Sequence, residues 1–129
     1  MKLKAIDILN LYDAFANLSG KELDLNTACT IAKNINILFV AKKVIDEKRN
    51  RLISDYAVKD SQGEIITDEN GAVKSFTDKE ALNQKLNDLF LSDVDVDNMN
   101  AIAKNALSDI KISPQALLVL LQSNLLDEE

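Results

Sequence analysis

The sequence contains no histidine and only one cysteine, Cys29. Without histidine the chain lacks the commonest general acid and base, and it cannot form a Ser-His-Asp triad or a Cys-His pair. A single cysteine excludes a disulfide within the chain, and the missing histidine removes the usual Cys/His zinc sites. Chemistry by carboxylates or lysines remains possible, but no motif points to it.

Glycine and proline are also scarce, with three glycines and one proline in the whole chain. The glycines form neither a GxGxxG pattern nor a phosphate-binding loop. Asp93-x-Asp95-x-Asp97 begins like a calcium loop, but Asn98 and Lys104 stand where that loop needs glycine and glutamate. An edge strand with outward aspartates, which discourage pairing between sheets, is the better interpretation. We therefore predict no enzymatic activity, no metal and no cofactor.

Aromatic residues make up only 5% of the chain, and the formal net charge is −6. A general nucleic-acid binder needs clustered lysine and arginine, so this class is disfavoured. The most apolar run, Ala116 to Leu121, is far shorter than the ~20 residues that cross a membrane. Asp7 interrupts the apolar run after a charged start, so no signal peptide is predicted. We expect a protein that acts inside its producing cell, without binding membranes.

The 129 residues suit a single domain with a core built mainly from aliphatic side chains. Periodicity predicts an α+β fold that is mainly helical, with a long central helix, a small antiparallel β-meander and a Leu-rich C-terminal helix. The predicted helices span residues 3–18, 26–56, 77–91 and 114–126, the meander spans 57–76, and a short edge strand spans 93–97.

Several short motifs set these boundaries. Gly20 is expected to end the first helix in a left-handed conformation, and Asp24 or Asn26 to cap the second. Thr77 and Glu80 read as a capping box for the third helix. Two similar pieces, eight residues apart, predict tight turns in the meander; they run from Asp60 to Ile65 and from Asp68 to Val73.

The predicted helix 26–56 is apolar on two sides, which is typical of a helix buried between two layers. Cys29 is interpreted as a small core residue on or beside the first stripe. Because the second stripe has no obvious cover within one small chain, we expect it to pair with another copy. The first stripe contains Ala28, Ile31, Ala32, Ile35, Leu38, Phe39, Ile45 and Leu52, and the predicted oligomer interface contains Ile37, Val40, Ala41 and Val44.

The C-terminal half of the same helix carries a cluster of basic residues. One hypothesis is a site for an anion or an acidic partner. The alternative is a solvated face with internal ion pairs such as Glu47 to Arg51, favoured because acidic residues are interleaved with the basic ones. The candidate binding residues are Lys42, Lys43, Lys48, Arg49 and Arg51.

The order of these parts, rather than any one motif, resembles a family of small proteins of tailed phages and prophages, mostly of unassigned function. The resemblance covers nearly the whole chain and implies a phage origin and action in the cytoplasm of an infected bacterium. It transfers no site residues. It rests on Met1-Lys2-Leu3, Ile31-Ala32-Lys33-Asn34, Lys59-Asp60, Asp68-Glu69-Asn70-Gly71, Leu86 to Phe90, Asp93 to Asp97 and Leu107 to Pro114.

Three functions follow as hypotheses. The first is a non-enzymatic binding protein that acts on a host or phage protein, as a takeover or anti-defence factor. The second is a minor virion or tail-assembly component. The third is a sponge for small signalling nucleotides, held by the basic cluster at a subunit interface, where several cations meet one anion.

Overall fold

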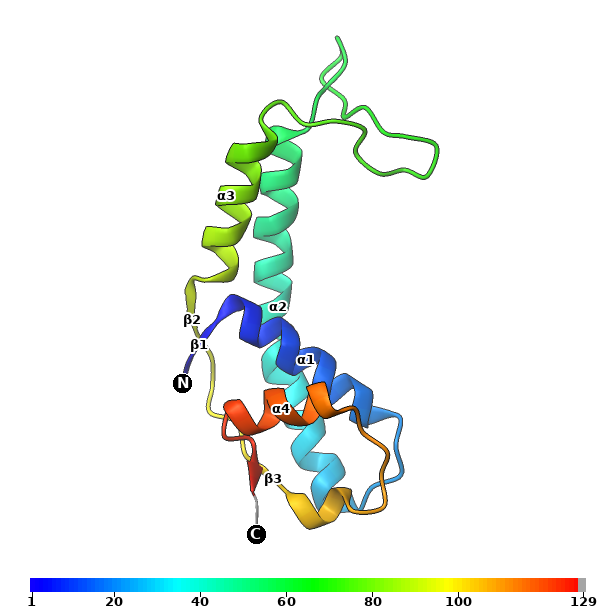
Figure 1. Ribbon diagram of the computed structural model, residues 1–129, viewed down its shortest axis with the longest axis vertical. Coiled ribbons are helices and arrows are strands. Elements are labelled where there is room, and N and C mark those ends of the chain that lie inside the picture. The colour runs from blue at the N-terminus through cyan, green and yellow to red at the C-terminus, as the bar shows by residue number, and fades with distance from the viewer. Residues whose placement is uncertain (128–129) are drawn as a thin grey trace. The chain divides into compact units, whose positions relative to one another are not determined.

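A computed structural model describes residues 1–127 of the chain. The fold is α+β and mainly helical, as the sequence predicts, with one long helix and two small sheets (Figure 1). Contacts within the chain divide it into two compact units. Unit 1 contains residues 1–43 and 93–129, and unit 2 contains residues 44–92.

Unit 1 begins with a short strand rather than a helix. Strand β1, Lys2–Lys4, pairs antiparallel with β2, Asp93–Asp95. Lys2 lies opposite Asp95, and Lys4 lies opposite Asp93. Opposite charges across a strand pair favour this register. The predicted helix start at Leu3 is therefore wrong, because residues far along the chain supply a strand partner that local periodicity cannot show.

Helix α1, Ala5–Ser19, supplies much of the core of unit 1. Ile8, Leu11, Phe15 and Leu18 recur on one face and are fully buried, as their spacing indicates. The expected left-handed ending at Gly20 is wrong, because its φ is −88°. The Ser19 hydroxyl instead donates a hydrogen bond to the carbonyl of Ala16 (2.6 Å).

Helix α2, Leu25–Tyr56, begins beside Asp24, one of the two predicted caps. The Asp24 carboxylate accepts a hydrogen bond from the backbone N–H of Thr27 (3.1 Å). Hydrogen bonds from the Thr27 side chain and from its backbone lower the pKa of Asp24 below the ordinary 3.8. The charged form of the carboxylate is therefore more stable at the start of the folded helix than in the unfolded chain.

Replacing Asp24 with alanine should lower stability in a way that depends on pH. A lowered folded pKa means that the contribution of Asp24 is fully present above the unfolded value of 3.8. The contribution is lost as the pH falls through the lower folded value. In urea denaturation, the free energy of unfolding of the wild type should exceed that of Asp24→Ala at neutral pH, and the difference should disappear in acid. Asp24→Asn also caps but does not titrate, so its stability relative to Asp24→Ala should not change with pH. A difference between the wild type and Asp24→Ala that persists unchanged in acid would contradict the assignment.

The last part of unit 1 differs most from the predicted pattern. Strand β3, Ile102–Ala103, leads into a short 3₁₀ helix η1, Lys104–Leu107, where the sequence is ambiguous. Helix α4, Pro114–Gln122, begins with the predicted Ser113 cap and packs on α1. It ends four residues before the predicted Leu126, because Asn124 turns the chain at φ 57°. Strand β4, Leu126–Asp127, then pairs parallel with β3.

Unit 2 joins the end of α2 to helix α3, Lys79–Phe90, which buries Leu82. The predicted capping box at Thr77 is wrong by one residue. Asp78 caps α3 by accepting a hydrogen bond from the backbone N–H of Ala81 (3.0 Å). The Thr77 hydroxyl instead donates to the carbonyl of Tyr56 at the end of α2 (3.3 Å). Both residues are good caps, so the sequence alone does not choose between them.

Between α2 and α3, three extended segments replace the predicted meander strands and are joined by isolated bridges. The backbone N–H of Val58 donates to the carbonyl of Ser75, that of Ile66 to Val58, and that of Lys74 to Ile66. Each segment is therefore bonded to both of the others. The donors are eight residues apart, which is the spacing of the repeated Asp-x-x-Gly turns. The repeat in the sequence thus corresponds to a closed ring of hydrogen bonds.

Both turns need glycine, and replacing Gly71 with alanine should weaken the second. The φ of Gly71 is +81°, and a Cβ there would meet nothing within 4 Å, so backbone strain alone sets the cost. We expect about 1 kcal/mol, which accelerates exchange of the Lys74 amide hydrogen about fivefold. Gly20→Ala, at an ordinary φ, is the control. Unchanged exchange in Gly71→Ala would contradict this conformation.

Candidate binding surface

A hollow runs along the part of α2 that belongs to unit 1. Its volume is about 430 Å³, within the range of sites that hold small apolar groups. The loop after α1 contributes Leu23, and α2 contributes the rest of the apolar lining: Ala28, Ile31, Ala32, Ile35 and Phe39. Ser19, Lys21 and Asn36 supply its polar edge. We call it the α2 hollow.

Phe39 is the most exposed large side chain of the α2 hollow, with 51% of its surface accessible. Its ring lies 6.4 Å from that of Tyr12 on α1, at an angle of 38°. The ammonium group of Lys42 lies 5.4 Å from the centre of the Tyr12 ring. Such exposed aromatic and cation contacts contribute about 0.5–1 kcal/mol each. The ring contact with Tyr12 leaves half of the Phe39 surface available to another molecule.

One lysine lines the α2 hollow, and others lie on the helix that forms it. The stretch from Leu25 to Lys43 contains three lysines and no acidic residue, although the chain as a whole is acidic. Lys21 lines the hollow, and Lys33 and Lys43 are exposed on α2. Lys43 follows Phe39 by four residues, so it lies about one turn further along the same face. The charge along this part of α2 is therefore positive, whereas Glu22 and Asp24 lie on the loop before it.

The five basic residues predicted from the sequence fall into two groups. Lys42 and Lys43 belong to unit 1, and Lys42 is engaged with Tyr12. Lys48, Arg49 and Arg51 belong to unit 2, where Arg49 pairs with Asp46 at 3.7 Å. Such exposed ion pairs contribute little to stability. Binding of a nucleotide by these residues stays a prediction.

The predicted oligomer interface is partly accessible. Val40 is 61% exposed and Val44 is exposed too, whereas Ile37 is half-buried and Ala41 is buried. Val40 follows Phe39 directly and therefore points about 100° away from it around the helix. Two different apolar faces of α2 are open. Cys29 is exposed, so its interpretation as a core residue is wrong.

A second apolar hollow lies beside α4 in unit 1, with a volume of about 640 Å³. Lys104 is the one charged residue in its lining. Leu121 lies at its edge, and the neighbouring Leu118 is 52% exposed. We call it the α4 hollow. Its apolar lining consists of Leu107, Ile110, Ile112, Leu117, Leu121 and Leu126.

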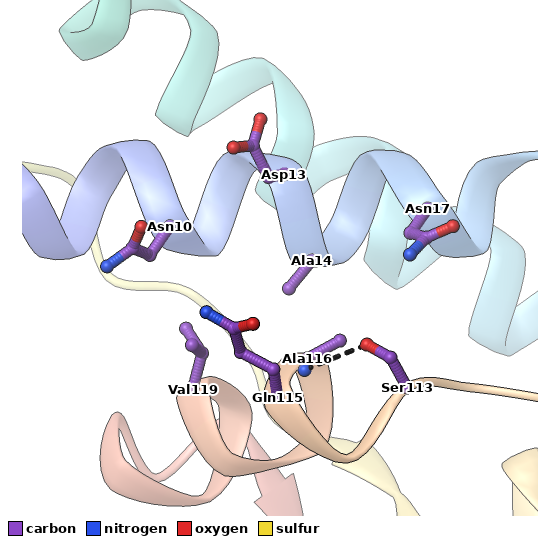
Figure 2. A pocket seen from close by; sticks show the side chains of 8 residues that line it. All are labelled: Asn10, Asp13, Ala14, Asn17, Ser113, Gln115, Ala116 and Val119. Carbon is purple, nitrogen blue, oxygen red and sulfur yellow. Dashed lines mark hydrogen bonds between the residues drawn. The ribbon is translucent and has the colours of Figure 1, made fainter.

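A third hollow, of about 230 Å³, is polar and lies between α1 and α4. Figure 2 shows Asn10, Asp13 and Asn17 along α1, with Gln115 on the facing helix. The Ser113 hydroxyl is already used, because it accepts a hydrogen bond from the backbone N–H of Ala116 (3.2 Å). The amide and carboxylate side chains are exposed, so water satisfies them and a ligand gains little by replacing it.

The sequence analysis did not identify two lysines in or near the α2 hollow, Lys21 and Lys33. The absence of acidic residues between Leu25 and Lys43 is a signal that could have found Lys33, whereas Lys21 lies outside that stretch. Sequence periodicity placed Phe39 correctly on the first stripe. Its exposure could not be predicted, because it depends on how far α1 and its loop cover α2.

Comparison with protein-family models, with curated proteins and with solved structures gives no match to this chain. Across residues 1–127, no helix has both the length and the apolar character needed to span a bilayer. Among the same residues, no three acidic or cysteine side chains are grouped so that they could hold a metal ion.

Proposed function

We propose that this chain is a non-enzymatic binding protein that acts on another protein. The observation that carries the proposal is the α2 hollow, where a half-exposed Phe39 borders an apolar lining. Large apolar side chains grouped on a surface are typical of interaction sites. Phenylalanine is also among the residues enriched at interfaces.

We also propose that the protein acts in an infected bacterial cell and that its target is a host or phage protein. The resemblance to small phage proteins supports this part of the proposal. The test is capture of partners from infected cells with the wild-type chain, with Phe39→Ser and with Leu118→Ser. Loss of a partner in one variant supports the proposal. Recovery of the chain alone with every bait contradicts it. Presence of the chain at fixed stoichiometry in purified particles would favour the virion alternative.

We also propose that α2 pairs with a second copy through Val40 and Val44. Val40→Asp should shift the protein from dimer to monomer in sedimentation, because it places a charge in an apolar contact. Leu118→Asp, which is similarly exposed on α4, is the matched control. A wild-type monomer at high concentration would contradict self-association.

A further inference from the structure

We infer that the α2 hollow receives an acidic amphipathic helix of the partner protein, an inference that rests on the proposed binding function. The occupant carries apolar side chains on one face and aspartate or glutamate beside that face. Two features of unit 1 support this chemistry: the shape of the hollow and the sign of the charge around it.

The shape of the hollow suits a short helix. Its lining on α2 runs from Ala28 to Phe39, which is about 16 Å or three turns along the helix axis. Ala32, Ile35 and Phe39 recur at three- and four-residue spacing, so they form one continuous stripe. An amphipathic helix that lies in such a groove inserts side chains of the same spacing.

The charge around the hollow selects an acidic occupant. Lys21 lies in the lining, Lys33 is exposed on α2, and Lys43 lies about one turn beyond Phe39. Glu22 and Asp24 carry negative charge on the loop before α2, but the helix itself has no acidic residue from Leu25 to Lys43. Because the chain as a whole is acidic, this cationic rim stands out locally and attracts aspartate and glutamate.

The α4 hollow does not share these features. Its lining also contains a single lysine, Lys104, but Asp109 and Asp127 directly adjoin lining residues, whereas α2 has no acidic residue between Leu25 and Lys43. It is larger and more apolar, so it provides a useful internal comparison. A partner that needs only apolar contact should prefer the α4 hollow, whereas an acidic amphipathic partner should prefer the α2 hollow.

The probe is a fluorescein-labelled helical peptide of about four turns, with leucines at helical spacing on one face and glutamates beside them. Its twin has lysine at every glutamate position. Titration with the full chain, followed by anisotropy, should show the acidic peptide binding at least about tenfold more tightly. Its affinity should fall as salt is added, because the attraction is between exposed charges.

Variants of the protein then show where the peptide binds. Phe39→Ser should weaken binding of the acidic peptide about tenfold or more, and Lys43→Glu should weaken it several-fold. Leu118→Ser and Lys111→Glu, two exposed positions outside the hollow, should change it less than about twofold. Circular dichroism should show every variant folded, since all four residues are exposed.

Equal affinity for the two peptides, no detectable binding of either, or no effect of Phe39→Ser would overturn the inference. The partner capture described above separates this failure from that of the proposed function. A natural partner lost with Leu118→Ser and kept with Phe39→Ser retains the binding function and rejects the α2 hollow. A concentration-dependent dimer that Phe39→Ser abolishes would show that a second copy is the occupant instead.

Discussion

Phe15→Ala should destabilise the protein by about 3–5 kcal/mol. The Phe15 side chain is fully buried in unit 1, on the same face of α1 as Leu11 and Leu18. Truncation removes its apolar contacts and leaves a cavity that close-packed neighbours fill only in part. The loss is a large share of the roughly 5–15 kcal/mol that stabilises an ordinary domain.

Urea denaturation followed by circular dichroism measures this loss as a shift of the midpoint at an unchanged slope. Phe39→Ala is the matched control, because it makes the same chemical change at a half-exposed position. We expect the control to cost about 1 kcal/mol or less. Similar losses in the two variants would contradict the assignment of Phe15 to the core.

Asn34→Asp should cost about 3–5 kcal/mol at neutral pH and distinctly less in acid. Asn34 is 1% exposed on α2. Its side-chain amide donates to the carbonyl of Asn100 (2.8 Å) and accepts from the N–H of Asn100 (3.3 Å). A carboxylate can still accept from that N–H, but it faces the carbonyl without a proton. The change therefore buries a charge and leaves an acceptor unpaired.

The pH dependence follows from burial. Desolvation should raise the pKa of the introduced carboxyl, so the folded state favours the protonated form. The penalty is then small below the unfolded pKa and grows as the pH rises through the folded value. Asn36→Asp is the matched control, because Asn36 is exposed two residues away. Denaturation should show that the free energies of unfolding of these two variants differ more at pH 7 than at pH 4. An equal difference at both pH values would contradict the buried hydrogen bonds between Asn34 and Asn100.

Asn34 shows what helical periodicity can predict and what it cannot. Asn34 lies on the same face of α2 as the buried Ile31, Leu38 and Ile45. An asparagine on an apolar face indicates a buried polar group that needs a partner. The partner, Asn100, lies 66 positions away in an ambiguous stretch, so the sequence could indicate the need but not the residue that meets it.

The other differences between prediction and structure have the same cause. Helix positions follow from local periodicity, and α1, α2 and α3 lie close to the predicted ranges. The alternating residues 93–97 predicted a strand where β2 lies, but not its pairing with β1. Strands β1, β3 and β4 have only two or three residues each, too few to show an alternating pattern. The pairing of β3 with β4 also ends α4 early, since Leu125 and Leu126 leave the helical path after Asn124.

The surface proposed for binding differs from the sites predicted from the sequence. The sequence predicted a second apolar stripe on α2 as an oligomer interface; Val40 on that stripe is exposed, and the pairing stays a prediction. The sequence placed the basic site further along the helix, at residues 42–51. The α2 hollow also depends on Lys21 and Leu23, which come from the loop after α1. A hollow built by two segments requires their packing, which no single periodic stretch encodes.

The most direct test of the α2 hollow is photo-cross-linking in infected cells. A benzophenone amino acid replaces Phe39 in the full chain, and the same group replaces Leu118, which is almost equally exposed, in a separate control. We predict that position 39 captures a partner, and that the captured peptide is an amphipathic segment rich in aspartate or glutamate. Position 118 should capture it weakly or not at all. Capture only at position 118, or at neither position, would contradict the assignment of the α2 hollow as the binding surface.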